Sequence, residues 1–269
     1  FCNINKGTKM YETILVERKE SVDWLTLNRP DRLNAINPIM CEELQDYFGK
    51  LSHNLETRVV IMKGAGKSFC AGYDLTDAID IAEANTVAGI RFQRQVSEIY
   101  MRMRRCPQPI ICLAHGATTG GGFAFALASD IRIIEKNTKI NVAMVKIGLT
   151  GCDVGISYFL PRSVGASVAA ELMMTGNFLD AERAERLNLV SRVVDLDQLD
   201  ETGAKMAEDM LKTSPMGLRF TKEGLNISID AGSLESVVAL EDRGQILCSA
   251  AGYFKEGIDA FRQKRKPEY

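Results

Sequence analysis

Three consecutive glycines, Gly120 to Gly122, separate an apolar run from a helix-like segment in the stretch TTGGGFAFALASD at 118–130. No charged side chain occurs in this stretch before Asp130. A glycine turn between a strand and a helix leaves backbone N–H groups unpaired, and the positive end of the helix dipole adds to them. The run is compatible with close helix–strand packing or with binding of an oxyanion. The GxGxxG spacing of a dinucleotide site is absent.

A second backbone-rich turn, CAGYD at 70–74, follows an apolar run at 59–64 that has the composition of a buried strand. If the two turns lie side by side, one N–H from each can hold a single carbonyl oxygen and stabilise charge that develops on it. The sequence therefore predicts an anion site made by the backbone rather than by side chains.

Apolar periodicity elsewhere alternates between strands and helices, which predicts an α/β fold. We expect strands at 11–18, 22–30, 59–64, 110–116 and 131–135, and helices at 38–53 and 88–105. From residue 199 onward only helical patterns follow, at 199–212, 215–226, 234–249 and 252–266. We therefore predict an α/β core over residues 1–200 and a helical C-terminal region over 201–269.

Composition excludes several classes of function. The net charge is −2, from 33 Lys and Arg against 35 Asp and Glu, so no basic field favours nucleic acid or an anionic membrane. No apolar run is long enough for a membrane span, and the apolar region of a secretory signal is missing, so we expect a cytoplasmic protein, or an organellar matrix protein in a eukaryote. Two histidines, and seven cysteines without CxxC spacing, predict no metal site and mostly buried, reduced thiols.

With both turns identified, the chain resembles the enoyl-CoA hydratase/isomerase superfamily, also called the crotonase fold. The resemblance rests on segments that occur in the family's order and cover nearly the whole chain. They are LNRPDRLNAI (27–36), GAGKSFCAGYDL (64–75), AHGATTGGGFAFALASDIRI (114–133), KIGLTGCDVGISYFLPRSVGA (146–166), LMMTGNFLDAERAERLNLVSRVV (172–194) and EGIDAFRQKRKPEY (256–269).

The resemblance implies a spiral of ββα repeats, a helical C-terminal region that mediates trimerisation, and a homotrimer or a hexamer. It also implies an acyl-CoA thioester as substrate, with coenzyme A as part of that substrate and no separate cofactor. The family's oxyanion donors fall on the backbone N–H groups of Tyr73 and Gly121. Two fixed dipoles of this kind suit a thioester enolate.

The same resemblance places coenzyme A contacts at both ends of the chain. Leu33, Asn34, Ala35 and Ala71 fall where the family binds the nucleotide end of coenzyme A. Phe261 and Lys264 fall at positions that reach a coenzyme A bound in a neighbouring subunit. A solvated basic tail, RQKRK at 262–266, is the alternative for Lys264.

The chain departs from the family's hydratases at both catalytic glutamates. Their positions hold Ala124 and Met144 here, and neither a methyl group nor a thioether transfers protons. Asp153 resembles an acid of the family's dienoyl-CoA isomerases and the attacking carboxylate of its dehalogenases, in an alignment that leaves Cys152 and Asp153 interchangeable by one position. An N-cap for a helix starting at Val154 is the alternative role for Asp153.

Among other side chains near the motifs, Asp74 is expected to be structural and His115 to be a satisfied core histidine. Met144, Phe123 and Phe125 are expected to form the wall of a pocket or of the core. The remaining ionisable candidates are Asp77, Asp80, Lys146 and Tyr158.

Three hypotheses follow from these residues. The leading one is an acyl-CoA enzyme that isomerises or hydrates an enoyl-CoA, with Asp153 transferring the proton. The second makes Asp153 the nucleophile of an acyl-CoA or aryl-CoA hydrolase or dehalogenase. The third is a non-catalytic oligomer that binds acyl-CoA.

Overall fold

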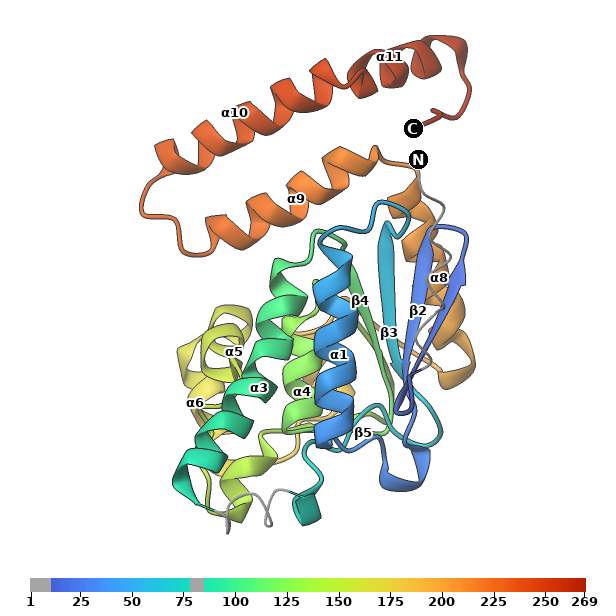
Figure 1. The fold of residues 1–269 in the computed structure, drawn as a ribbon. Coiled ribbons are helices and arrows are strands. Elements are labelled where there is room, and N and C mark those ends of the chain that lie inside the picture. Colours follow the sequence, from blue (N-terminus) through green and yellow to red (C-terminus); the bar gives the residue numbers. More distant parts are fainter. Residues whose placement is uncertain (1–10, 78–84) are drawn as a thin grey trace.

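The structure, a computed structural model, describes residues 11–77 and 85–269. In this part of the chain the main sheet has the strand order β1-β2-β3-β4-β6-β8 (Figure 1). Its strands are β1 (Ile14–Lys19), β2 (Val22–Leu27), β3 (Val59–Gly64), β4 (Ile110–Ala114), β6 (Ile131–Glu135) and β8 (Arg192–Val194). β1 and β2, which fall in the first two predicted strands, form an antiparallel hairpin, and every later pair is parallel.

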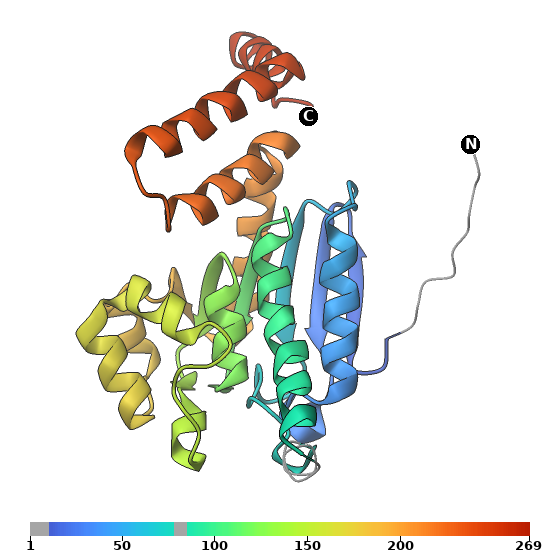
Figure 2. The ribbon, with the colours of Figure 1, turned by 60° about the vertical axis from the view of Figure 1, so that its left-hand side comes forward.

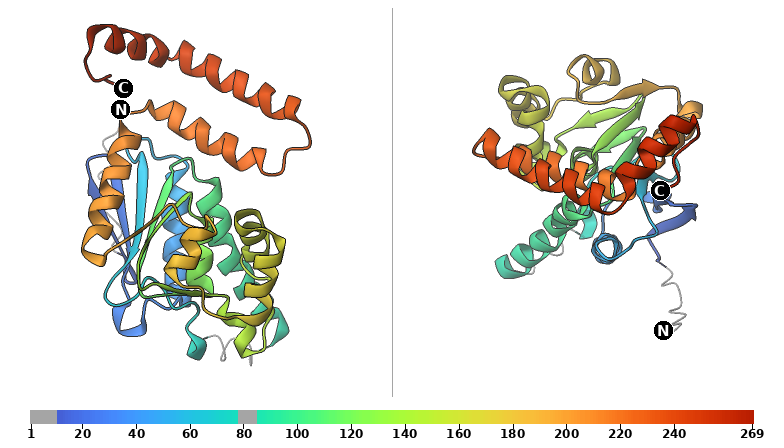
Figure 3. Two further views of the ribbon diagram at one scale, coloured as in Figure 1. Left: turned by 180° about the vertical axis from the view of Figure 1, so that it is seen from behind. Right: turned by 90° about the horizontal axis from the view of Figure 1, so that it is seen from above.

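Helices cover both faces of this sheet. One face packs against α1 (Pro38–Leu51), α3 (Thr86–Arg105) and α4 (Gly121–Ala128), and α8 (Leu199–Leu211) lies on the opposite face (Figure 3). Because both faces are covered, β3 and β4 are almost entirely buried and read as continuous apolar runs. The α/β class predicted from the sequence is confirmed.

Local signals set the ends of the helices that carry the site. The side chain of Asn37 accepts a hydrogen bond from Met40 N at 2.9 Å, and Pro38 occupies the first turn of α1. At the C-terminal end of α3, the backbone of Cys106 is extended, as expected for a residue that precedes proline.

A small second sheet, which the sequence did not predict, carries the glycine run. β5 (Ala117–Thr119) pairs in parallel with β7 (Lys139–Asn141). Three-residue strands are too short to produce a readable alternation of apolar and polar residues. Short helices complete this part of the spiral (Figure 2): η1 (Pro30–Arg32), η2 (Ala143–Ile147), α5 (Ile156–Val164), α6 (Ala166–Thr175), α7 (Ala181–Arg186) and η3 (Leu196–Gln198).

The last three helices project away from the sheet (Figures 1 and 2). They are α9 (Pro215–Ser228), α10 (Leu234–Ala250) and α11 (Tyr253–Gln263). Because α8 contributes Leu199 and Ala207 to the apolar layer on the sheet, the projecting part of the C-terminal region starts at α9. The division at residue 200 stays a prediction. None of the helices in the described ranges has the length and apolar character needed to cross a membrane.

One buried lysine fastens α9 to the core. The ammonium group of Lys222 donates to Met103 O at 3.1 Å and to Gln108 O at 2.8 Å, and it lies 2.9 Å from Asp130 Oδ2. The lysine side chain is only 3% exposed. Because one charge of a buried pair is costly without the other, this contact is a strong constraint on where α9 sits.

We expect Lys222→Met to lower the free energy of unfolding by roughly 2 kcal/mol, because the buried carbonyls of Met103 and Gln108 lose their donor. Asp130 keeps its ion pair with Arg104. Lys212→Met is the matched control, since Lys212 forms only exposed ion pairs, with Glu208 and Asp209 on α8. Urea denaturation of both variants measures the difference. Equal midpoints for the two would contradict this role for Lys222.

Candidate active site

The structure brings the two predicted turns side by side. Cys70 N donates to Ala117 O, and Thr119 N donates back to Cys70 O, each at 3.0 Å. One step further along, a Cβ atom at position 72 would lie 3.4 Å from Gly121 N. The segment before α1 adds a third layer, because Ile36 forms a parallel bridge with Tyr73.

The glycine run makes this close approach possible. A Cβ atom at Gly122 would lie only 2.1 Å from Cys70 O, so any other residue there would push α4 away from the first turn. Gly120 has φ +53°, a left-handed conformation that favours glycine. Close packing, one of the two uses predicted for the run, is therefore realised.

The packing leaves two amides available at this junction. Neither Tyr73 N nor Gly121 N donates a hydrogen bond to an acceptor within the described residues. Gly121 is also the first residue of α4, where the partial positive charge of the helix dipole is centred. The two amides predicted to act together thus lie on adjacent turns, and both are free to bind a ligand oxygen.

Asp153 does not cap a helix as the alternative role required, and its charge acts on Tyr73 of the first turn. Its Oδ1 accepts hydrogen bonds from Val154 N and from the side chain of Gln93 on α3. Val154 and Gly155 have φ of +40° and +89°, so the chain turns there and α5 begins only at Ile156, with Gly155 as its N-cap. Burial raises the pKa of Asp153, while the hydrogen bonds from Val154 and Gln93 oppose this effect.

The structure also distinguishes Asp153 from its neighbour Cys152. Cys152 is an exposed free thiol whose backbone N donates to Thr150 Oγ1 at 3.1 Å. Its side chain makes no hydrogen bond in the described structure, whereas Asp153 is held from two sides. Of these two neighbours, Asp153 is therefore the one whose side chain is held in place.

Two tyrosine side chains lie beside the second turn. Tyr100 of α3 donates from its hydroxyl to Gly121 O at 3.0 Å. A Cβ atom at Gly121 would lie 3.1 Å from this hydroxyl and 3.7 Å from Cζ of Tyr73, so both phenols end beside the second turn. Burial and then the charge of Asp153 raise the pKa of Tyr73, and burial is also the main cause of the raised pKa of Tyr100. Both phenols are therefore protonated at neutral pH.

The positions of the two missing glutamates are apolar surfaces in the structure. Ala124 is fully buried in the first turn of α4, and Met144 of η2 is 6% exposed. Phe123 and Phe125 are also buried, and Phe125 stacks on Tyr100 with 4.9 Å between ring centroids. These residues form the wall that the sequence predicted.

The residues predicted to bind the nucleotide end of coenzyme A form one group. Leu33 O accepts a hydrogen bond from Ala71 N at 3.0 Å, which joins this segment to the first turn. The side chain of Asn34 is buried and donates to Ala65 O and Ser68 O, both at 2.8 Å, so its amide holds the loop together. Ala35 is buried, whereas Leu33 is 42% exposed. Their contact with coenzyme A stays a prediction.

Phe261 and Lys264 are not brought to this junction within one chain. Phe261 is 83% exposed on α11, and Lys264 ends that helix in a left-handed conformation. α11 lies at the opposite end of the molecule from the N-terminus of α4 (Figure 1). A contact with coenzyme A in a neighbouring subunit stays a prediction.

The other ionisable candidates serve the fold or lie elsewhere. Asp74 forms an ion pair with Arg29 at 3.1 Å, and His115 Nε2 lies 3.0 Å from Gly66 O, as expected for a structural carboxylate and a satisfied core histidine. Lys146 contacts Asn177, and the hydroxyl of Tyr158 donates to Asp230. Asp77 forms no hydrogen bond or ion pair with the described residues, and Asp80 lies outside them.

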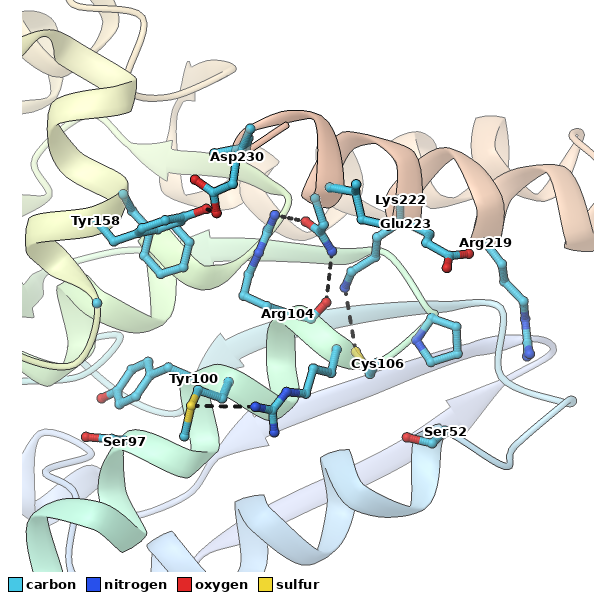
Figure 4. Close-up of a pocket in the computed structure, with 18 of the residues that line it drawn as sticks. Ser52, Ser97, Tyr100, Arg104, Cys106, Tyr158, Arg219, Lys222, Glu223 and Asp230 are labelled. Carbon is cyan, nitrogen blue, oxygen red and sulfur yellow. Dashed lines mark hydrogen bonds between the residues drawn. The ribbon is translucent and has the colours of Figure 1, made fainter. Parts of the chain in front are cut away.

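A cavity of about 1080 Å³ lies between α3, α5 and α9, with Tyr100 in its wall (Figure 4). Val154 and Gly155, which directly follow Asp153, line it together with Tyr100 and Phe159. On the α9 side its lining includes Phe220, Lys222, Asn226, Ile227 and Asp230. The cavity thus shares the wall residue Tyr100 with the amide junction.

Sequence reasoning missed Gln93 and the two phenol groups. Tyr100 follows the apolar stripe of α3 with Val96, Ile99 and Met103, so its spacing indicates a core residue. Gln93 lies seven residues before Tyr100 and therefore on the same face of the helix. The hydrogen bond between Gln93 and Asp153 becomes visible only in the structure.

Comparison with known proteins agrees with this architecture. Residues 17–269 match the family model described as enoyl-CoA hydratase/isomerase. The 1,2-epoxyphenylacetyl-CoA isomerase of Escherichia coli K12 is 33% identical, over 97% of this chain and 99% of that protein. The crystal structure of an enoyl-CoA hydratase from Bacillus anthracis superimposes with a TM-score of 0.91 at 29% identity, covering 96% of this chain and 99% of the other.

An isomerase is also among the solved relatives. A monofunctional enoyl-CoA isomerase from M. smegmatis superimposes with a TM-score of 0.72 at 37% identity, covering 84% of this chain and 98% of the other. The fold is therefore that of the crotonase class. The chain belongs to the enoyl-CoA hydratase/isomerase family, whose members act on acyl-CoA thioesters.

Proposed function

We propose that the protein isomerises the double bond of an enoyl-CoA, with the N–H groups of Tyr73 and Gly121 binding the thioester oxygen and Asp153 moving one proton. The observation that supports this most is the pair of free amides on adjacent turns, together with a carboxylate, Asp153, that is held by Gln93 and Val154 and whose charge acts on Tyr73. The apolar residues Ala124 and Met144 leave Asp153 as the proton carrier.

The steps follow from these groups. Asp153 removes a proton from the carbon next to the thioester or from the carbon beyond the double bond, and the negative charge passes to the thioester oxygen. Two amide dipoles that are already oriented stabilise that oxygen without reorganisation. Asp153 then returns the proton to the other carbon, which moves the double bond and leaves the composition of the substrate unchanged.

The acyl chain, in this proposal, extends past Tyr100 into the cavity between α3, α5 and α9 (Figure 4). The nucleotide end of coenzyme A lies toward Leu33, Asn34, Ala35 and Ala71, on the other side of the first turn. Two relatives are named as isomerases, which supports isomerisation as the reaction. Proton migration does not need a positioned water, so one carboxylate suffices for it.

The test is turnover of 3-enoyl-CoA, trans-2-enoyl-CoA and dienoyl-CoA substrates, followed by the gain or loss of conjugated absorbance. We expect 3-enoyl-CoA to gain conjugation without adding mass. Binding of acyl-CoA without turnover of any of these substrates would favour the non-catalytic oligomer instead.

The pH dependence of this reaction carries a signature of Asp153. Because burial raises its pKa, the carboxylate that acts as the base is lost at a higher pH than for an exposed aspartate. We expect kcat/KM to be level near neutral pH and to fall as the pH drops through this raised pKa. A profile in which kcat/KM stays level below the usual pKa of aspartate would exclude Asp153 as the base.

Stability has the opposite dependence on the same group. A carboxyl group whose pKa is raised by folding disfavours the folded state when it is ionised, and this penalty vanishes as the pH falls through that pKa. Asp153→Asn should therefore be more stable than the wild type at neutral pH and lose this advantage in acid. Thermal melts over the acid range measure it.

A further inference from the structure

Two cations and one carboxylate meet at the side of the cavity formed by α9. Arg104 Nη1 lies 3.1 Å from Asp130 Oδ1, and Lys222 Nζ lies 2.9 Å from Asp130 Oδ2. Neither cation has a second acidic partner among the described residues. Arg104 and Lys222 both line the cavity, with side chains that are 22% and 3% exposed. This side of the cavity therefore carries one positive charge more than its carboxylate balances.

The neighbouring charges do not remove this excess. Arg132 of β6 donates only to backbone carbonyl groups, and it forms no ion pair with the described residues. Burial lowers the pKa of Arg132, and the charge of Arg104 acts in the same direction. The other charged residues that line the cavity are two cations and two acids: Arg105, Arg219, Glu223 and Asp230. Because a buried charge without a partner is costly, an anionic group of a ligand would be favoured here.

The guanidinium group of Arg104 keeps hydrogen-bond donors for such a group. Its Nη1 donates to Ala128 O and to Asp130, and its Nη2 donates to the side chain of Asn226 on α9. Nε–H and one N–H of Nη2 donate to no described residue. A guanidinium with two donors left suits a carboxylate, which accepts with two oxygens. Lys222 differs, because its ammonium group already donates to two carbonyls and pairs with Asp130.

Helix α3 connects Arg104 to the amide pair. Tyr100 donates to Gly121 O at 3.0 Å and also lines the cavity, and Arg104 follows it by four residues on the same face of α3. Figure 4 shows the Arg104 side chain reaching from α3 toward α9. An acyl chain that passes Tyr100 along α3 meets Arg104 about 6 Å further on. The apolar groups of Val154 and Phe159 line the same cavity and suit the methylene groups of such a chain.

From this arrangement we infer that the substrate is an acyl-CoA whose acyl chain ends in a carboxylate, and that Arg104 binds this carboxylate and selects the substrate. The inference rests on the proposed function, because the thioester of the same molecule lies at the Tyr73 and Gly121 amides. No bond forms or breaks at Arg104. Its role is to favour one class of acyl chain and to fix how far that chain enters the cavity.

The experiment compares two 3-enoyl-CoA substrates of equal length, one ending in a methyl group and one in a carboxylate, over a series of chain lengths. We expect the wild type to turn over the carboxylate-ended chain with a kcat/KM roughly tenfold or more higher, the contribution of a charge-assisted hydrogen bond. This preference should peak at one chain length, because the guanidinium is held in place by Asp130 and Asn226.

Three variants test the residue itself. Arg104→Gln should remove the preference for the carboxylate-ended chain and leave kcat/KM for the methyl-ended chain nearly unchanged, a difference that a purely structural role would not produce. Arg104→Lys should keep only part of the preference, because an ammonium lacks the paired donors. Arg102→Gln is the matched control and should keep the wild-type ratio. Arg102 also lies on α3, pairs with Glu98 and donates to Gln45 O, but it does not line the cavity.

Calorimetric binding of the two saturated acyl-CoA ligands separates the inference from the function on which it rests. In the wild type, the carboxylate-ended ligand should bind roughly tenfold more tightly, and Arg104→Gln should abolish this difference. If Arg104→Gln does not fold, Arg104→Lys, which keeps a charge beside Asp130, takes its place in both measurements.

Each outcome decides one of the two proposals. Equal kcat/KM values and equal affinities for the two chain ends in the wild type would overturn the inference and leave the isomerase intact. A preference that survives unchanged in the folded Arg104 variants would overturn the role of Arg104. Turnover of neither chain, with tighter binding of the carboxylate-ended ligand, would remove the proposed reaction and support the carboxylate site.

Discussion

Replacing Asp153 with asparagine is expected to lower kcat/KM for isomerisation by about 10²- to 10⁴-fold, the range that a positioned acid or base contributes. Asparagine has nearly the same shape, and its amide oxygen can still accept from Val154 N and from Gln93. It cannot take up a proton. Affinity for a saturated acyl-CoA should change little, because the amides at Tyr73 and Gly121 are untouched.

The measurement pairs turnover of a 3-enoyl-CoA with calorimetric binding of a saturated acyl-CoA. Asp209→Asn is the control, because Asp209 is an exposed carboxylate on α8 that pairs with Lys212. Wild-type turnover in Asp153→Asn would show that another group moves the proton. Label from isotopically marked water incorporated into Asp153 of the wild type after turnover would instead support the nucleophile of a hydrolase or dehalogenase.

A second large effect is expected from Gly72→Ala, which acts on the geometry of the two turns. Gly72 has φ +96°, and an added Cβ atom would lie 3.0 Å from Thr119 O and 3.4 Å from Gly121 N. The methyl group would separate the turns and move Tyr73 N relative to Gly121 N. Loss of one oxyanion donor costs roughly 10²- to 10³-fold in kcat, and we expect a loss of this size.

The control for Gly72→Ala needs the same backbone strain without the contact. Gly252 has φ +87°, and a Cβ atom there would meet nothing within 4 Å. Gly252→Ala should lose about 1–2 kcal/mol of stability, the cost of a left-handed residue, and Gly72→Ala should lose this amount plus the cost of its contact with Thr119 O. Only Gly72→Ala should lose catalysis. Equal kcat values in the two variants would show that the spacing of the two turns does not control the reaction rate.

Much of the fold could be predicted because its signals are local. The buried runs of β3 and β4, the hairpin of β1 and β2, and the four C-terminal helices follow from apolar periodicity and from proline and glycine positions. β5 and β7 could not be predicted in this way, because three residues carry no period and their pairing joins segments far apart in the sequence.

The candidate site also has a part that local sequence signals predict and a part that they do not. Its backbone part was predictable, since glycine turns after strands point to free N–H groups, and the resemblance selected Tyr73 and Gly121. Of its side-chain part, the resemblance selected only Asp153. The bend at Val154 and Gly155 that prevents Asp153 from capping α5 depends on tertiary packing, and so does the contact of Gln93 with that carboxylate.

The most direct test of the amide pair is the structure of the protein with a saturated, unreactive acyl-CoA bound. We predict that the thioester oxygen lies about 3 Å from both Tyr73 N and Gly121 N, a normal hydrogen-bond length. A thioester oxygen bound by other groups, with either amide directed away from it, would contradict the proposed chemistry.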